Sequence, residues 1–326
     1  MGTTQPLVSC RDLHIAFRFP CGQSAEAVRG VDFSIDETET LAVVGESGCG
    51  KTMTALALMR LVPDPPGRIT AGSIVFEGRE LLTLPEPQMR SIRGSRISMI
   101  FQDPMTSLNP VYTCRYQIRE SIIQHNVAKG ADADPIIESI LGEVGISSPR
   151  QVADCYPHEL SGGMRQRVMI AMALVCNPRL LIADEPTTAL DVTVQARILD
   201  LLHALQSEKR MSMMLITHNL GIVGDIADKV MVMYAGEVME YASVRMLFDT
   251  PLHPYTTNLL ETLPSVDRRK ERLTVIPGEV PTLRDTPGGC PFHPRCSRRT
   301  ERCATHHPEL RDCDGSGHLV RCFLYE

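Results

Sequence analysis

The segment from Gly45 to Thr52 has the residue types and spacing of a loop that binds nucleotide phosphates. Its glycines allow backbone N–H groups to face an anion without a Cβ in the way. Lys51 can reach the β- and γ-phosphates, and the Thr52 hydroxyl can join the ligands of Mg²⁺. The predicted phosphate-binding residues are Gly45, Glu46, Ser47, Gly48, Cys49, Gly50, Lys51 and Thr52.

The residues around this loop supply the context that it needs. Residues 41–44 are apolar and predict a buried strand, and residues 53–61 predict a helix. A helix that begins at the loop adds the positive end of its dipole to the phosphate site. A chance glycine turn beside a lysine would lack this strand–loop–helix order.

Two carboxylates follow a second apolar strand, predicted at residues 180–183. Ligands of open α/β sheets bind beyond the carboxyl ends of the strands. Asp184 is therefore expected to hold Mg²⁺, in part through water, and Glu185 to act as general base on the attacking water. The alternative, an acidic pair that only caps a strand, does not account for the phosphate loop in the same chain.

A third candidate site lies at Ser161-Gly162-Gly163, before a strongly apolar helical segment. Ser161 is a natural N-cap, and the two glycines leave backbone N–H groups open to an anion. The chain thus carries two separate candidate phosphate-binding segments.

Composition narrows the classes of function. The chain has 326 residues and a net charge of −6, which argues against nucleic acid as a partner. No run of 18 apolar residues predicts a membrane span, and the first residues lack the pattern of a signal peptide. We expect a cytoplasmic protein with reduced thiols.

Strands and helices alternate along most of the chain, which predicts an α/β fold around a mostly parallel sheet. We expect a nucleotide-binding core at residues 1–103 and 166–244, with an antiparallel β subdomain in its first part. Residues 104–165 predict a helical subdomain, with helices at 116–125 and 136–144. Residues 245–326 are rich in Pro, Gly and Cys and predict a C-terminal extension.

Taken together, these motifs resemble those of ATP-binding-cassette (ABC) ATPases, a family of P-loop NTPases. The resemblance implies that Ser161, Gly162 and Gly163 of one subunit cover the nucleotide held by the phosphate loop of another. The usual residue after this signature is Gln, and Met164 stands there instead. The resemblance also implies roles for Gln102 (Mg²⁺ and the membrane partner), Asp191 (the dimer-interface loop, with Ala189 and Leu190) and His218 (the γ-phosphate).

An aromatic residue upstream of the phosphate loop is expected to stack on adenine. Phe17 is our candidate, and Phe19 is the alternative. A stacked purine contributes only about 1–3 kcal/mol by analogy with other base-stacking sites. Asn219, next to His218, stands where the family usually has Asp.

Three further segments, at residues 101–110, 252–260 and 276–281, resemble the oligopeptide, dipeptide and nickel importers within that family. The resemblance implies a di- or oligopeptide importer ATPase, with nickel or another small solute as the alternative cargo. It implies three kinds of partner: a second ABC ATPase subunit that is a different chain, two transmembrane permease subunits, and an extracytoplasmic solute-binding protein. The chain would then lie at the cytoplasmic face of the plasma membrane as a peripheral subunit.

Five of the eleven cysteines fall within the last 37 residues. Cys290, Cys296, Cys303 and Cys322 have the spacing C-x5-C-x6-C-x18-C, which is not the C-x2-C pair of structural zinc sites. Four thiolates suit a [4Fe–4S] cluster, as the resemblance also implies, while zinc or free thiols remain alternatives. Cys313 is left out of this set.

Two other classes of function fit these motifs less well. DNA-repair ABC ATPases carry long coiled coils between the glutamine and the signature, but only 57 residues separate Gln102 from Leu160. Ribosome-acting members usually contain two cassettes, whereas this chain has one set of motifs. An iron–sulfur sensor that binds nucleotide without hydrolysis is disfavoured by the presence of Lys51, Asp184, Glu185 and His218.

Overall fold

The computed structural model describes residues 5–103, 107–129, 132–187, 191–263 and 276–326. The chain divides into two compact units, one formed by residues 1–83 and 215–326 and the other by residues 84–214. Among the described residues, no helix combines the length and the hydropathy needed to cross a bilayer.

The first unit opens with an antiparallel sheet in the strand order β2-β1-β4-β5. The sequence predicted an antiparallel β subdomain in this part of the chain, and these strands do pair in antiparallel fashion. Apolar and polar residues alternate along β1, as expected for a strand with one buried face. The strands are β1 (Val8–Arg18), β2 (Ser24–Ile35), β4 (Gly67–Phe76) and β5 (Arg79–Glu80).

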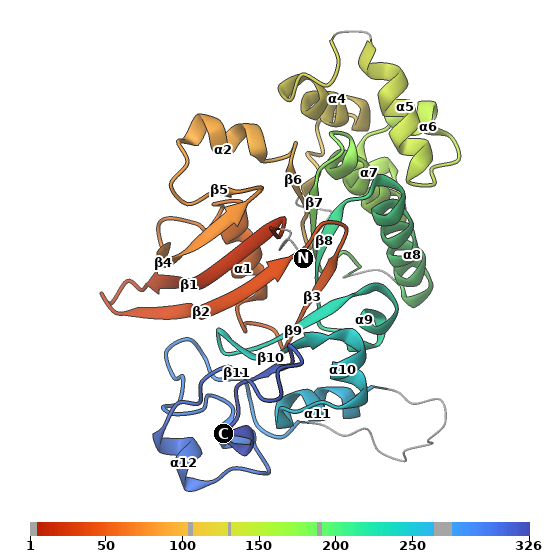
Figure 1. Cartoon of the computed structure of the whole chain (residues 1–326). Coiled ribbons are helices and arrows are strands. Elements are labelled where there is room, and N and C mark those ends of the chain that lie inside the picture. The colour runs from red at the N-terminus through yellow and green to blue at the C-terminus, as the bar shows by residue number, and fades with distance from the viewer. Residues whose placement is uncertain (1–4, 104–106, 130–131, 188–190, 264–275) are drawn as a thin grey trace. The chain divides into compact units, whose positions relative to one another are not determined.

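A second sheet in this unit has the order β11-β12-β10-β9-β3. Strands β3 and β9 are parallel, as predicted, but β9, β10, β12 and β11 pair with one another in antiparallel fashion. Helices α9 and α10 lie along this sheet (Figure 1). The elements are β3 (Thr40–Val44), α1 (Lys51–Leu58), α9 (Leu220–Ile226), β9 (Lys229–Tyr234), β10 (Glu237–Ser243), α10 (Val244–Asp249), α11 (Pro254–Glu261), β11 (Arg311–Asp312) and β12 (Leu319–Val320).

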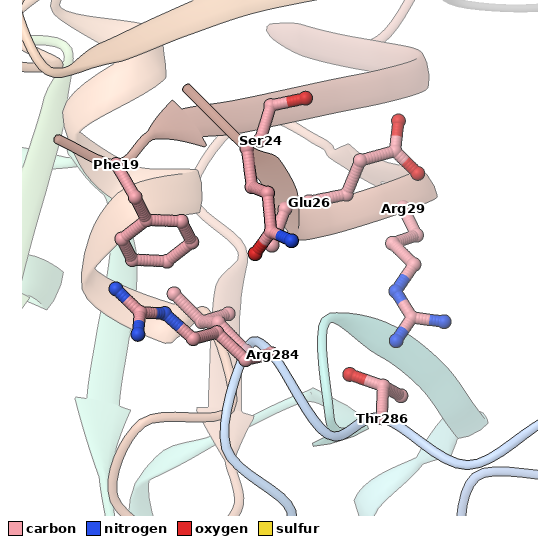
Figure 2. A pocket seen from close by; sticks show the side chains of 9 residues that line it. Phe19, Ser24, Glu26, Arg29, Arg284 and Thr286 are labelled. Carbon is pink, nitrogen blue, oxygen red and sulfur yellow. The ribbon is translucent and has the colours of Figure 1, made fainter. Parts of the chain in front are cut away.

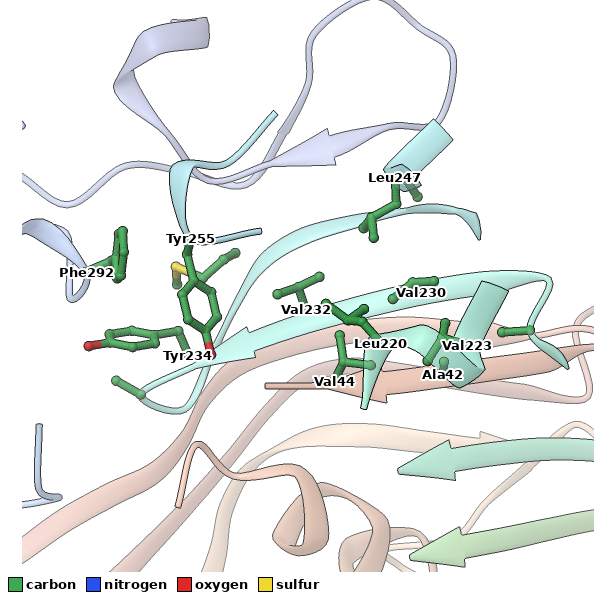
Figure 3. Close-up of a cluster of buried hydrophobic side chains, with 14 of the residues drawn as sticks. Ala42, Val44, Leu220, Val223, Val230, Val232, Tyr234, Leu247, Tyr255 and Phe292 are labelled. Atoms are coloured by element: carbon green, nitrogen blue, oxygen red, sulfur yellow. The ribbon is translucent and has the colours of Figure 1, made fainter. Parts of the chain in front are cut away.

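The C-terminal extension is built into the core of this unit. Tyr255 of α11 and Phe292 are fully buried and pack around Tyr234 at the end of β9 (Figure 3). Short helical turns at His293–Arg295 (η3), Glu301–Thr305 (α12) and Phe323–Tyr325 (η4) complete the extension. Aromatic burial of this size contributes strongly to packing, so the extension is not an appended tail.

A buried carboxylate also holds the extension in place. Glu240 of β10 is fully buried and accepts hydrogen bonds from the backbone N–H groups of Leu252 and His253 and from the ring of His318. His253 Nδ1 in turn caps α11 by accepting from the Tyr255 N–H. Residues 252–256 thus fasten the extension onto the core.

The second unit contains two parallel strands and a set of helices. Strands β6 and β7 pair in parallel, as predicted. The helices expected at 116–125 and 136–144 are present as α4 and α5, so the helical character of this region is confirmed. The elements are α2 (Glu86–Ile92), β6 (Ile97–Ile100), α4 (Cys114–Gln124), α5 (Ala133–Glu143), α6 (Pro149–Ala153), η2 (Pro157–Glu159), α7 (Gly162–Leu174), β7 (Leu180–Asp184) and α8 (Val192–Lys209); strand β8 (Ser212–Thr217) contains the boundary between the units.

Candidate functional site

The predicted site residues fall in both units. The first unit contains Phe17, residues 45–52 and His218. The second contains Gln102, residues 161–163, Asp184, Glu185 and Asp191.

The phosphate loop joins β3 to α1 in the predicted strand–loop–helix order. Gly45 and Gly50 have φ angles of 151° and 103°, which side chains rarely adopt. A Cβ at Gly45 would lie 2.2 Å from the Met233 carbonyl oxygen, and one at Gly50 would lie 2.7 Å from that of Ala27. These two positions therefore require glycine, and the loop can keep this shape only with that residue.

Lys51 lies at the start of α1 with its side chain turned into the loop. Its Nζ donates to the carbonyl oxygens of Gly45 and Glu46 over 2.8 and 3.0 Å. The residue is only 5% exposed, so the ammonium group is held within the loop and does not extend into solvent. Thr52 follows it in the first turn of α1, where a helix N-terminus favours anions.

The extension contacts this loop at Glu46. The Glu46 carboxylate receives two hydrogen bonds from Arg295, of 2.6 and 3.0 Å. The Glu46 N–H donates to the Tyr255 hydroxyl over 3.0 Å. Neither contact was predicted, because the partners lie more than 200 positions away and no local pattern connects them.

The two aromatic candidates for adenine stacking have different surroundings. The Phe17 ring packs against Gly67 of β4, where a Cβ would lie 2.9 Å from the ring. Phe19 lines an open cavity of about 550 Å³, and the Arg284 guanidinium stacks on its ring at 4.2 Å from the centroid (Figure 2). Ser24, Glu26 and other polar residues line the same cavity. The assignment to Phe17 stays a prediction.

His218 follows β8 directly and is exposed. The adjacent Asn219 caps α9 by accepting a hydrogen bond from the Gly221 N–H over 3.0 Å, and its own N–H donates to Thr217. Asn219 therefore has a defined structural role at the position where the resemblance led us to expect Asp.

In the second unit, the predicted carboxylates end β7. Asp184 is buried, while Glu185 is partly exposed and has a φ of 45°. Left-handed backbone at a residue other than Gly is uncommon and is often found at functional sites. The Gln102 Nε2 donates to the Glu185 Oε2 over 2.9 Å. Two residues selected from separate sequence motifs therefore contact each other.

The signature segment begins α7. The Ser161 hydroxyl accepts a hydrogen bond from the Met164 N–H, which confirms the predicted N-cap. Gly163 packs closely on α8, since a Cβ there would lie 3.3 Å from Val194. The buried Gln166 donates to the Pro186 carbonyl over 2.6 Å. Helix α7 is thus connected to the segment that follows Glu185.

The Asp191 carboxylate caps α8 by accepting from the Val194 N–H over 3.0 Å. Its neighbours Ala189 and Leu190 lie outside the described residues, as do Pro104, Met105 and Thr106 of the segment that follows Gln102.

The four selected cysteines of the extension line one small cavity of about 130 Å³, together with residues that include Arg298 and Arg302. Burial raises the pKa of the Cys290 thiol to about 12, and burial also raises the pKa values of Cys296 and Cys322. In the part of the chain that the structure describes, no three His, Cys, Asp or Glu side chains are grouped closely enough to hold a single metal ion. The exposed Cys313 is not among the lining residues.

Comparison with known proteins agrees with these motifs. Residues 28–188 match the model of the ABC transporter family, and residues 239–303 match the C-terminal region of oligopeptide/dipeptide transporters. The oligopeptide transport ATP-binding protein AppD of Bacillus subtilis is 52% identical over 300 residues, which cover 92% of this chain and 91% of that protein. The chain belongs to the family of ABC transporter ATP-binding proteins.

Two further similarities extend over most of the chain. The dipeptide transport ATP-binding protein DppD of Bacillus subtilis is 45% identical over 322 residues, covering 99% of this chain and 96% of that protein. The ABC cassette MJ0796, solved as a dimer bound to ADP and Pi, superposes with a TM-score of 0.65 at 24% identity, covering 73% of this chain and 99% of that one. This structural likeness shows the fold alone, while the family model and the similarity to AppD identify the chain as an ABC ATPase.

Proposed function

We propose that this ATPase energises the import of dipeptides or oligopeptides through a membrane permease. The observation that carries the proposal is that one chain combines the phosphate-loop domain with the transporter-type C-terminal region. The named relatives, an oligopeptide and a dipeptide transport ATP-binding protein, support peptides as cargo. Nickel or another small solute is the alternative.

Within each subunit, Lys51 would bind the β- and γ-phosphates, and the Thr52 hydroxyl, Gln102 and Asp184 would surround Mg²⁺. Glu185 would accept the proton of the attacking water. Its hydrogen bond from Gln102 supports this role, because a base held by a second polar group has a defined orientation.

The remaining motif residues imply a dimer of cassettes. Ser161, Gly162 and Gly163 would cover the nucleotide of a second subunit, Asp191 would lie at the interface between the subunits, and His218 would contact the γ-phosphate. The capped N-terminus of α7 supports the first role, since helix N-termini bind anions. ATP would close the dimer, and hydrolysis would reopen it.

The proposed assembly contains two transmembrane permease subunits, an extracytoplasmic solute-binding protein and a second ATPase chain, which we expect to differ from this one. This subunit would then be a peripheral protein of the cytoplasmic face of the plasma membrane. The segment that begins at Gln102 would transmit cassette closure to the permease.

Copurification and transport test this proposal. The tagged chain should copurify with two permease subunits, and proteoliposomes of the complex with its binding protein should take up labelled dipeptides or oligopeptides only with ATP. Uptake of nickel but not of peptides would refute the cargo assignment. A purified chain that hydrolyses ATP but associates with no membrane protein would refute the transport role.

We further propose that Cys290, Cys296, Cys303 and Cys322 hold a [4Fe–4S] cluster. The support is that all four side chains line one small cavity. Four cysteine thiolates are the usual ligands of a [4Fe–4S] cluster. Arg298 and Arg302 would offset the negative charge of the thiolates.

Iron and sulfide analysis of protein purified without oxygen tests this assignment. About four iron and four sulfide per chain, with broad absorbance in the visible blue, are expected. Cys303→Ser should lower both contents, and Cys313→Ser, which removes a cysteine outside the cavity, should not. Zinc in place of iron, or loss of iron in Cys313→Ser alone, would contradict the assignment.

A further inference from the structure

Glu46 places a negative charge in a loop that must bind a polyanion. It is the second residue of the phosphate loop, and its side chain is 28% exposed. An unpaired carboxylate there would repel the phosphates of ATP, because charges within several ångströms interact strongly when they are partly shielded from water. The loop therefore requires a partner that neutralises Glu46.

Arg295 is that partner. Its two terminal nitrogens donate to the two carboxylate oxygens of Glu46 over 2.6 and 3.0 Å, a fork-to-fork arrangement that is stronger and more directional than a single bond. Arg295 is 5% exposed, and it lies in the extension, 249 residues from Glu46.

The Arg295 side chain also forms hydrogen bonds with residues other than Glu46. Its Nε donates to the Pro277 carbonyl over 2.9 Å, and its other donors also reach the Tyr234 hydroxyl and the Ile276 carbonyl. Arginine stays protonated in proteins, so its guanidinium brings a full positive charge to Glu46. A buried ion pair contributes little net stability, so these contacts point to a role other than stability.

Tyr255 completes the contact between the extension and the loop. Its hydroxyl accepts the Glu46 N–H, and burial raises its pKa, so it remains a neutral phenol. The extension therefore contacts Glu46 twice. Tyr255 binds its backbone N–H, and Arg295 pairs with its carboxylate.

We propose that Arg295 is a positioning residue of the nucleotide site, which neutralises Glu46 and keeps the phosphate loop competent to bind ATP. The C-terminal extension is on this view a part of the ATP site. Arg295 directly precedes Cys296, which lines the four-cysteine cavity, so the same segment contributes to both places. This inference rests on the proposed role of residues 45–52 in phosphate binding, but not on the proposed peptide cargo.

The test is the dissociation constant of a fluorescent N-methylanthraniloyl-ATP, measured with the full-length protein. Arg295→Met should weaken binding roughly tenfold, within the range that coupled charged residues show. The double variant Arg295→Met/Glu46→Gln should recover most of the loss, because it removes the unpaired charge. Arg295→Lys should have an intermediate dissociation constant, because lysine keeps the positive charge but cannot donate two parallel hydrogen bonds to the carboxylate.

Raising the ionic strength provides a second readout. The deficit of Arg295→Met should shrink with salt, since screening reduces repulsion between Glu46 and the phosphates. A purely structural role of Arg295 would predict neither this salt effect nor the recovery in the double variant. Urea unfolding of each variant shows whether the fold is retained.

Arg311→Met is the matched control. Arg311 lies in the same extension and forms an exposed ion pair with Glu309, so its loss should leave nucleotide affinity unchanged. Wild-type affinity in Arg295→Met, or a double variant as weak as Arg295→Met, would overturn the inference. Lys51→Ala separates the two proposals: if it leaves binding intact, the phosphate-loop assignment itself fails.

Discussion

Gln102 and Glu185 contact each other through a 2.9 Å hydrogen bond from the amide nitrogen to the carboxylate. They come from different sequence motifs, 83 positions apart. Glu185 has left-handed backbone at the end of β7, and Gln102 follows β6, its parallel neighbour. The pairing of two strands thus brings a proposed base and a proposed Mg²⁺ ligand together at the carboxyl ends of both strands.

Replacing Gln102 should slow hydrolysis. Gln102→Ala removes the amide that orients Glu185, so the ATPase rate constant should fall by about tenfold to a hundredfold. Steady-state ATPase assays over a range of Mg²⁺ concentrations should also show a raised Mg²⁺ requirement. Gln88→Ala, an exposed glutamine on α2 of the same unit, is the control. Equal rates for both variants would show that the Gln102 contact is unimportant for hydrolysis.

The two aromatic candidates can be separated by a pair of alanine variants. Phe17→Ala should weaken ATP binding by about 1–3 kcal/mol, the range for a base stacked on an aromatic side chain. Phe19→Ala should have a smaller effect. Titration with ATP and with the triphosphate alone distinguishes loss of base stacking from loss of phosphate contacts. The reverse order of effects would assign adenine to Phe19 and its cavity.

The signature serine can be tested against another helix cap. Ser161→Ala removes the N-cap of α7 and should cost about 1 kcal/mol of unfolding free energy. Ser243→Ala removes the equivalent cap of α10 and should cost a similar amount. Only Ser161→Ala should also depress the ATPase activity of the assembled dimer, because only Ser161 is proposed to touch nucleotide. Equal activity in the two variants would limit Ser161 to its structural role.

The helical part of the second unit should show an acid-sensitive contact. Arg115 donates to Asp154 and Asp134 over 2.7 and 2.9 Å, and these hydrogen bonds hold the pKa values of both carboxyl groups below their usual 3.8. The stabilisation is therefore present above about pH 3.8 and is lost as the pH falls further, when the carboxylates become protonated.

Because both carboxylates are well exposed, the effect on stability should be small. Urea unfolding monitored by far-UV circular dichroism should give a free energy that falls with acid in the wild type and falls less steeply in Arg115→Met. Identical pH profiles for the two proteins would argue against the contact.

Local chemistry made much of this site predictable. The Gly45–Thr52 spacing, the N-cap at Ser161 and the carboxylates after an apolar strand are all set by neighbours in the sequence, so the pattern predicts them. The parallel pairs β3·β9 and β6·β7 follow from the alternation of strands and helices. The antiparallel pairing of β10 with β9 was not predicted, and β11 and β12, with two residues each, are too short to show a periodicity.

Long-range contacts explain what sequence reasoning missed. The Arg295 side chain, for example, donates to Glu46, 249 positions away. Nothing in the residues near position 295 encodes a partner near position 46. The residue that stacks on adenine was also ambiguous. Phe17 and Phe19 are only two positions apart, and only tertiary packing distinguishes their surroundings.

Glu185 is the proposed base that activates water for ATP hydrolysis, and the whole mechanism depends on it. The decisive measurement is the ATPase rate of Glu185→Gln, combined with its nucleotide affinity and its oligomeric state in the presence of ATP. We predict that this variant binds ATP, accumulates closed dimers and has lost nearly all turnover. Hydrolysis at the wild-type rate would show that Glu185 is not the base.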